Sequence, residues 1–236
     1  MNHDGFVVIL GDLHFPFARD KVEAVVDQIL GLSPNKVFIL GDLTEMGSDY
    51  EFSELSKILQ KLSSQGIGIY ELLGNHDTRW SSRNRKGVEG FKSFSIRCGP
   101  FTFLGLDTSL YFEHYGHIGN RQIQWIESQL KETEGPVVMM AHHPFGGPSN
   151  FTDDGWKLMN LIDGSNVRLV LVGHGHSYGV NGRYNGAWFQ MVGAAKDGWY
   201  TVLSWKGDES FLWALNIDGG CNLIKRIPLS EEKECH

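Results

Sequence analysis

Short, largely apolar runs alternate with amphipathic stretches along the first half of the chain. The apolar runs cover residues 6–10, 36–40 and 67–73, and each is followed by a Gly-Asp or Gly-Asn pair. Between them, residues 20–30 and 50–62 carry apolar side chains at helical spacing. Repetition of strand and helix in this way favours a largely parallel sheet with helices packed against it.

The second half begins with a predicted hairpin, residues 91–96 and 101–106, around a Gly-Pro turn. Further along we expect helices at 120–130 and 155–162, strands at 137–141 and 167–172, and short alternating strands from 180 to 227. We expect a single domain, residues 1–236, in which two sheets pack face to face with helices outside. The strands from about residue 180 are predicted to extend the second sheet.

Composition narrows the functional classes. The apolar share of 41% excludes a disordered chain, and no apolar run approaches the roughly 20 residues that span a bilayer. With 21 Lys and Arg against 28 Asp and Glu, the net charge of −7 disfavours unspecific binding to nucleic acid or to anionic membranes. Three cysteines without CxxC spacing indicate free thiols in a reducing compartment.

Residues 1–5 carry neither a basic segment nor a hydrophobic one, as a secretory signal would. We therefore expect a cytoplasmic protein, either a monomer or a homodimer. The alternative is a mature chain from which a signal has been removed, since that would look the same.

Polar clusters follow five of the predicted strands, and they contain six of the ten histidines. Ligands bind beyond the carboxyl ends of parallel strands, so the five loops should converge. Any one cluster alone is equally typical of a turn or a helix cap. Together they indicate a site; they are Gly11-Asp12-Leu13-His14, Gly41-Asp42, Gly74-Asn75-His76-Asp77, His142-His143-Pro144 and Gly173-His174-Gly175-His176.

The side chains of these clusters predict metal binding. Carboxylates, an amide oxygen and neutral imidazoles suit Mn²⁺, Fe, Zn²⁺ or Ni²⁺, and the lack of a thiolate excludes a structural cysteine-zinc site. Seven ligands are too many for one ion. Two ions that share a carboxylate about 3.5–4 Å apart fit better, and that spacing suits in-line attack on phosphorus.

The ordered motifs resemble the calcineurin-like metallophosphoesterase superfamily from residue 6 to about residue 180. This resemblance implies an α/β fold, a four-layer α/β/β/α sandwich of two mixed sheets flanked by helices, and phosphoric ester hydrolase activity. It also implies two divalent or transition metal ions. Carried over residue by residue, it assigns Asp12, His14 and His176 to the first ion, Asn75, His142 and His174 to the second, and Asp42 to the bridge.

The same resemblance suggests further roles around the metals. His76 is similar to the histidine that contacts the reacting phosphoryl group and protonates the leaving oxygen, and Asp77 would orient it. His142 is preferred over His143 as a ligand because the first position of His-x-Pro ligates in relatives. His143 would then lie behind the ligands or face the substrate.

Arg79 and His114 are candidate substrate contacts. Arg79 belongs to a basic stretch, residues 78–86, and His114 to an aromatic stretch, residues 111–117. For both the alternative is a solvent-exposed loop.

Departures from family patterns narrow the substrate class. Residues 41–47 lack the Asp-Arg of serine/threonine protein phosphatases, and Glu45 stands where purple acid phosphatases carry a tyrosine. Residues 106–109 and 119–126 are similar to the class III cyclic-nucleotide phosphodiesterase-like branch. We expect hydrolysis of a small anionic phosphodiester, such as a cyclic nucleotide, through attack on phosphorus by a hydroxide held between the ions. The alternatives are a phosphomonoesterase of nucleotides or other small phosphate esters, and an inactive scaffold.

Overall fold

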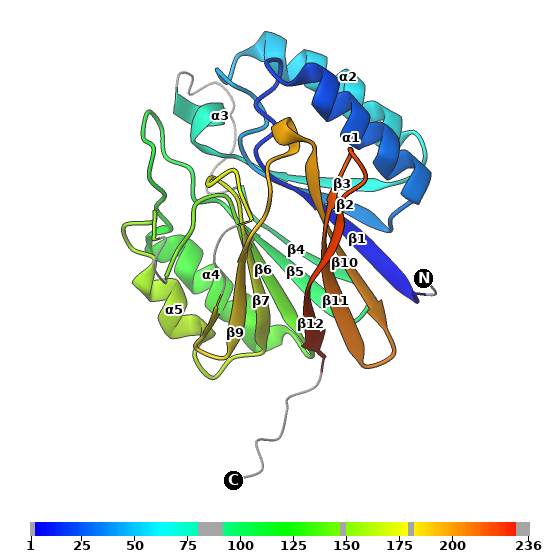
Figure 1. Cartoon of the computed structure of the whole chain (residues 1–236). Helices are drawn as coiled ribbons and strands as arrows, with labels where there is room; N and C mark the ends of the chain where they lie inside the picture. Colours follow the sequence, from blue (N-terminus) through cyan, green and yellow to red (C-terminus); the bar gives the residue numbers. More distant parts are fainter. Residues whose placement is uncertain (1–2, 80–91, 147–149, 179–181, 230–236) are drawn as a thin grey trace.

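The computed structural model describes residues 3–79, 92–146, 150–178 and 182–229, and it arranges them in two six-stranded sheets that face each other (Figure 1). The first sheet has the order β12-β11-β10-β1-β2-β3, and the second has the order β4-β5-β6-β7-β9-β8. Each sheet mixes parallel and antiparallel pairs. The expected pair of mixed sheets is therefore confirmed.

The first sheet joins strands from the two ends of the chain. β1 pairs in parallel with β2, and β2 with β3, whereas β10 pairs antiparallel with the other side of β1. The strands are β1 (Gly5–Leu10), β2 (Lys36–Leu40), β3 (Gly68–Leu72), β10 (Trp199–Lys206), β11 (Glu209–Asn216) and β12 (Cys221–Pro228).

The second sheet has a parallel centre and antiparallel edges. β5, β6, β7 and β9 run in parallel, with β4 and β8 antiparallel at the two sides. The strands are β4 (Phe94–Cys98), β5 (Phe101–Leu106), β6 (Val137–Ala141), β7 (Val167–Val172), β8 (Arg183–Tyr184) and β9 (Ala187–Met191).

Helices cover the outer face of each sheet. α1 (Arg19–Leu32) and α2 (Asp49–Ser63) pack on the first sheet, and α4 (Gly119–Glu132) and α5 (Trp156–Ile162) pack on the second (Figure 1). The start of α2 is fixed by a reciprocal capping box between Ser48 and Glu51. A short helix, α3 (Asn75–Arg79), follows β3, and a 3₁₀ turn, η3 (Ala195–Asp197), precedes β10.

Alternating side chains along each buried strand divide the core into three layers. In β1, Val7 and Ile9 pack between the sheets, while Val8 and Leu10 face the helices. β6 divides in the same way, with Val138 inward and its neighbours against α4 and α5. Three apolar layers separate four structural layers, as the α/β/β/α expectation requires. Among the described helices, none has both the length and the apolar character needed to cross a bilayer.

One predicted feature of the topology is wrong. The strands after residue 180 were expected to extend the second sheet, but only β8 and β9 do so. β10, β11 and β12 join the first sheet through β1. Alternating apolar strands fit either sheet equally well, and the choice depends on long-range pairing that has no local sequence signal.

Candidate metal centre

The five polar loops converge at one end of the sandwich. The parallel strands β1, β2 and β3 end together, as do β6 and β7, so the following loops share that edge. Hydrogen bonds join the two sheets there: the His174 N–H donates to Asp12 Oδ1 at 2.9 Å, and His142 Nδ1 donates to the Leu40 carbonyl oxygen at 2.8 Å. The expected convergence is confirmed.

Five of the seven predicted ligands have left-handed backbone conformations, in which residues other than glycine are uncommon. The residues and φ angles are Asp12 (51°), His14 (46°), Asp42 (46°), His174 (68°) and His176 (56°). Such conformations cost free energy and persist where the surrounding fold holds them. Their concentration in these loops indicates that local stability has been given up for side-chain placement.

The first group of donors contains Asp12, His14, Asp42 and His176, with one donor atom of each within 4.8 Å of the others. His14 Nε2 lies 2.9 Å from His176 Nε2, and His176 Nε2 lies 3.6 Å from Asp12 Oδ1. Asp12 Oδ2 is buried and has no hydrogen-bond partner among the described residues. A buried carboxylate oxygen without a partner is costly, and a cation would satisfy it.

The second group contains Asn75, His142 and His174. Asn75 Oδ1 lies 3.1 Å from His142 Nε2 and 2.9 Å from His174 Nδ1, and the two histidine nitrogens are 3.3 Å apart. Asp42 lies between the groups, because its Oδ2 is 3.6 Å from His14 Nε2 and its Oδ1 is 3.4 Å from His142 Nε2. One carboxylate therefore faces both sets of donors.

Hydrogen bonds behind the imidazoles fix which nitrogen faces the centre. The Leu40 carbonyl only accepts, so His142 Nδ1 carries a proton and Nε2 presents a lone pair. His14 Nδ1 donates to Glu45 Oε2 at 2.7 Å, which turns His14 Nε2 inward in the same way. Support of this kind orients metal-ligating histidines and makes them more basic.

Electrostatics favour cation binding at neutral pH. Burial lowers the pKa of His14, His142 and His174 to about 3, so at neutral pH these imidazoles are uncharged, as metal ligands must be. Burial also raises the pKa of Asp12 and Asp42, and repulsion from Asp42 adds to the rise for Asp12. A divalent cation would offset both penalties.

Two glycines leave the space in which the groups meet. A Cβ at Gly74 would lie 2.2 Å from Asp42 Oδ1 and 2.8 Å from His142 Cε1. Gly41 has φ +86°, and a Cβ there would lie 2.8 Å from the His142 ring. The glycines that end the predicted strands thus permit close packing of the donors. The types of donor atom, and the space that these glycines leave between them, both fit a site for two divalent ions.

His76 lies at the open side of this centre. Its backbone N–H donates to Asp42 Oδ1 at 2.9 Å, and its ring Nδ1 donates to the Glu45 carbonyl oxygen at 2.9 Å. The ring is partly exposed and borders a cleft of about 470 Å³. The cleft is lined by His14, Phe17, Ala18, Glu45, His76, His176, Lys196 and Asp197.

The role expected of Asp77 is not the one the structure gives it. Asp77 is fully buried, and its carboxylate accepts hydrogen bonds from the backbone N–H groups of Leu43, Thr44 and Gly74 and from the Thr44 hydroxyl. The His76 ring is oriented by Glu45 instead. A carboxylate next to a histidine in sequence points elsewhere because α3 turns successive side chains by about 100°.

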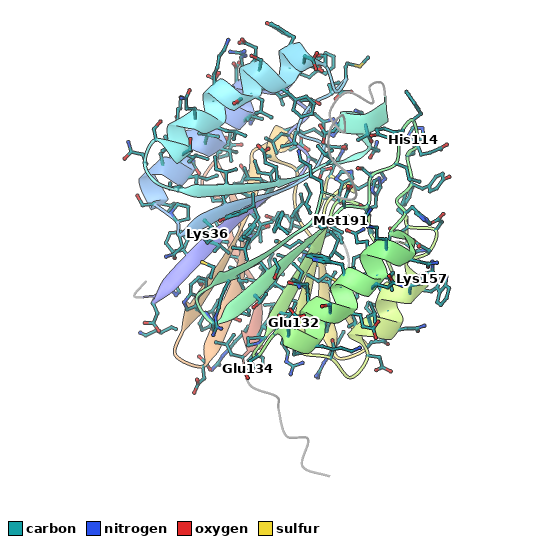
Figure 2. All side chains as sticks on the ribbon, turned by 180° about the vertical axis from the view of Figure 1, so that it is seen from behind. Lys36, His114, Glu132, Glu134, Lys157 and Met191 are labelled. Carbon is teal, nitrogen blue, oxygen red and sulfur yellow. The ribbon has the colours of Figure 1, made fainter. Side chains whose placement is uncertain are left out.

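The three candidate substrate contacts have different outcomes. His143 is 0% exposed, and its Nδ1 lies 2.8 Å from Thr108 Oγ1, so of its two expected positions the buried one fits. Its Nε2 is buried without a hydrogen-bond partner among the described residues, and a ring nitrogen of His143 lies within 4.8 Å of donor atoms of His142 and His174. His114 is exposed, beside α3 in Figure 2, on a loop held by the Phe112 N–H donating to the Thr78 carbonyl. The side chain of Arg79 and the rest of the basic stretch after it lie outside the described residues.

Sequence reasoning missed five of the residues that line the cleft: Phe17, Ala18, Glu45, Lys196 and Asp197. Glu45 was interpreted only as the absence of a tyrosine, although its place three residues after Asp42 marks it as a neighbour of the centre. Phe17 and Lys196 carried no motif. Lys196 comes from the tail that was expected to join the other sheet, so its approach could not be predicted.

Comparisons with known proteins agree with this geometry. A family model described as calcineurin-like phosphoesterase matches residues 7–178. A protein of Rhodococcus erythropolis named a probable cyclic nucleotide phosphodiesterase is 26% identical over 194 residues, which cover 72% of this chain and 64% of that protein. A 3′,5′-cyclic-nucleotide phosphodiesterase of Nostoc is 30% identical over 175 residues, which cover 69% of this chain and 64% of that protein. The matches span less than two thirds of these relatives.

Solved structures share the fold. A dimetal phosphatase from Danio rerio superposes with a TM-score of 0.77 at 13% identity, covering 97% of this chain and 100% of that one. A purple acid phosphatase from yellow lupin gives a TM-score of 0.73 at 15% identity, covering 97% of this chain and 54% of that one. At these identities the likeness shows a common architecture.

Proposed function

Because the chain belongs to the calcineurin-like phosphoesterase family, we propose that it hydrolyses a small phosphodiester, such as a cyclic nucleotide, at a centre of two divalent metal ions. The observation that carries this proposal is the position of Asp42. Its two carboxylate oxygens face two separate sets of donors, at 3.6 Å and 3.4 Å from His14 and His142. A shared carboxylate is what a two-ion centre requires.

We assign the ligands as the two groups suggest. Asp12, His14 and His176 would hold one ion, Asn75, His142 and His174 the other, and Asp42 would bridge them. Two bound ions supply Lewis-acid charge for the phosphoryl oxygens and lower the pKa of water towards neutrality. The protein's part is to hold neutral imidazoles and ionised carboxylates in place before substrate arrives.

His76 is proposed as the group that protonates the leaving oxygen. Its Nδ1 proton is engaged by the Glu45 carbonyl, so the proton for the leaving group resides on Nε2 and the acting form is the imidazolium. The Glu45 carboxylate, with Oε1 3.4 Å from Nδ1, stabilises that positive charge. His76 borders the cleft, as a proton donor to substrate must.

The preference for a diester is supported by the curated relatives. Five of them are named cyclic nucleotide phosphodiesterases or probable ones, at 22–30% identity. The cleft, with a volume of about 470 Å³, is within the size range of sites for nucleotide-sized ligands. The complete set of seven donors argues against an inactive scaffold.

The proposal is tested by loading the protein with Mn²⁺ and measuring hydrolysis of bis-p-nitrophenyl phosphate and p-nitrophenyl phosphate side by side. We expect the diester to be preferred, activity to disappear with a chelator, and Asp42→Ala to be inactive. Asp153→Ala, which removes an exposed carboxylate paired with His117 outside the cleft, is the matched control and should retain activity. Preference for the monoester would overturn the choice of substrate, and hydrolysis of neither ester would overturn the proposal.

A further inference from the structure

The cleft beside the proposed metal centre is also lined by residues that the proposed chemistry leaves unused, among them Phe17 and Lys196. Phe17 is 81% exposed, although Phe15, two residues before it, is fully buried. The Phe17 N–H donates to the His14 carbonyl at 3.1 Å, so its position is tied to a residue of the first donor group. Isolated exposed aromatics are ordinary on surfaces, but this one borders a cleft next to donor groups.

Lys196 reaches the same cleft from the other end of the chain. The 195–197 turn, η3, lies against the loop after β1 (Figure 1), where the Ala195 N–H donates to the Gly11 carbonyl at 2.7 Å and the Lys196 N–H to the Asp12 carbonyl at 3.1 Å. These bonds belong to an isolated parallel bridge between Gly11 and Ala194, just before β10 begins at Trp199. Lys196 therefore stands at a fixed place relative to Asp12.

The charge of Lys196 suits an anionic ligand. Among the described residues that line the cleft, it is the one lysine or arginine, and Glu45 and Asp197 are the acids. Its Nζ lies 3.3 Å from Asp197 Oδ2, and its side chain is 28% exposed, so the ammonium is restrained and accessible. A restrained ammonium at the entrance of an anion site binds phosphoryl oxygens and attracts the substrate.

We propose that Phe17 and Lys196 form the substrate-recognition wall of this cleft, in which Lys196 binds a phosphoryl oxygen and the Phe17 ring stacks on an aromatic group of the same ester. The inference rests on the proposed function, because it takes the scissile phosphate to lie at the donor groups. It narrows the substrate class to phosphate esters that carry a ring system, such as a nucleobase. Lys196 lies beyond the residues matched by the family model.

Binding of two products tests the role of Phe17. In Mn²⁺-loaded protein, we compare the affinity for adenosine 5′-monophosphate with that for ribose 5-phosphate, which has the phosphate and no base, by calorimetry. Wild type should prefer the nucleotide, and Phe17→Ala should reduce that preference about three- to tenfold. Trp156→Ala removes a 62% exposed aromatic from α5, over the other sheet, and should leave the preference unchanged. An unchanged preference in Phe17→Ala, or a wild type that binds neither compound, would overturn the role of Phe17.

Two substitutions test the role of Lys196: one removes its positive charge and the other keeps it. Lys196→Met should lower the affinity for both AMP and ribose 5-phosphate, and kcat/KM for the diester, about 10- to 100-fold, mainly through KM. Lys196→Arg should recover most of this loss, which a purely structural role would not produce. Equal affinities in wild type and Lys196→Met, with the same thermal unfolding temperature, would overturn the role of Lys196.

Different results would overturn the proposed function and the proposed recognition wall. If the Mn²⁺-loaded wild type hydrolyses neither ester, the proposed function fails, while the product affinities still decide whether the wall recognises phosphate and base. If wild type is an active diesterase and the Phe17 and Lys196 variants match it in affinity and kcat/KM, the wall fails alone.

Discussion

Glu45 contacts two histidines with different tasks. Its Oε2 accepts from His14 Nδ1 at 2.7 Å, while its carbonyl accepts from His76 Nδ1 at 2.9 Å and its Oε1 lies 3.4 Å from that nitrogen. One residue therefore orients a proposed metal ligand and the proposed acid. A carboxylate here would also stabilise the positive charge of His76 in its proposed role as proton donor.

From these contacts we expect Glu45→Gln to lower kcat about 10- to 100-fold while the metal content changes less. Glutamine can still accept from His14 but cannot stabilise an imidazolium by charge. Steady-state kinetics and elemental analysis on the same preparation measure both effects. Glu127→Gln, on an exposed carboxylate of α4 paired with Lys131, is the control. Equal kcat values in wild type and Glu45→Gln would show that Glu45 has no positioning role.

The pKa of Asp42, the proposed bridging carboxylate, is expected to set the pH range of metal binding. Burial raises its pKa to about 6, whereas the imidazoles of His14, His142 and His174 have a pKa of about 3. Metal ligands must be deprotonated, so protons compete for Asp42 near pH 6 and for these imidazoles only in stronger acid. On acidification, the carboxylates are therefore the first of these ligands to be protonated.

We expect the apparent Mn²⁺ affinity to be nearly constant above pH 7 and to fall as the pH drops through about 6, by up to about tenfold per pH unit for each proton displaced. Because the folded-state carboxyl pKa is raised, the loss occurs on acidification and not in alkali. Calorimetric Mn²⁺ titrations between pH 5 and pH 8 measure it. An affinity independent of pH across this range would contradict the assignment of Asp42.

At the scale of elements, Asp77 joins the loop after β2 to the loop after β3. Its buried carboxylate accepts from the N–H groups of Leu43, Thr44 and Gly74. Those loops carry Asp42, the proposed bridge, and Asn75, a proposed ligand of one of the two ions. A single carboxylate at the start of α3 thus aligns two elements by satisfying their backbone donors.

Removal of this carboxylate leaves several buried donors unpaired. We expect Asp77→Ala to reduce the free energy of unfolding by on the order of 3 kcal/mol, because each unpaired buried donor costs about 1–3 kcal/mol. Asp77→Asn, which keeps one acceptor oxygen, should lose less. Urea denaturation of the metal-free variants compares their free energies of unfolding. A decrease below about 1 kcal/mol in Asp77→Ala would contradict the proposal that this carboxylate holds the two loops together.

How much of this could be predicted from sequence depends on where the determining contacts lie. The runs at 6–10, 36–40 and 137–141 have a local signal, since strands buried on both faces are continuously apolar and end at polar turns. The donor loops follow because parallel strands end together. Neither the pairing of β10 with β1 nor the bridge of Ala194 to Gly11 had a local signal, so the position of Lys196 was missed. The direction of the Asp77 side chain depends on its position around helix α3, and not on its being next to His76 in the sequence.

At the scale of the whole molecule, the donors come from both sheets. Asp12, His14, Asp42 and Asn75 follow strands of the first sheet, whereas His142, His174 and His176 follow strands of the second. Bound ions would therefore connect the two halves of the sandwich at one end. An ion that binds the folded chain alone adds RT ln(1 + [L]/Kd) to stability.

We expect Mn²⁺ at about 100 times its Kd to stabilise the protein by about 2.7 kcal/mol per ion, raising its thermal unfolding temperature, and a chelator to reverse the effect. Differential scanning calorimetry across a Mn²⁺ series measures the shift. Asp42→Ala should show little of it. If neither Mn²⁺ nor chelator changes the unfolding temperature, no bound ions connect the two sheets.

The central claim, two ions held on either side of Asp42, is tested most directly by counting Mn²⁺ bound per chain at saturation by elemental analysis. We predict two ions in wild type, about one in His14→Ala and in His142→Ala, and none retained in Asp42→Ala, all with folded protein by circular dichroism. A wild type that saturates with a single ion, or an Asp42→Ala variant that retains two, would contradict the account.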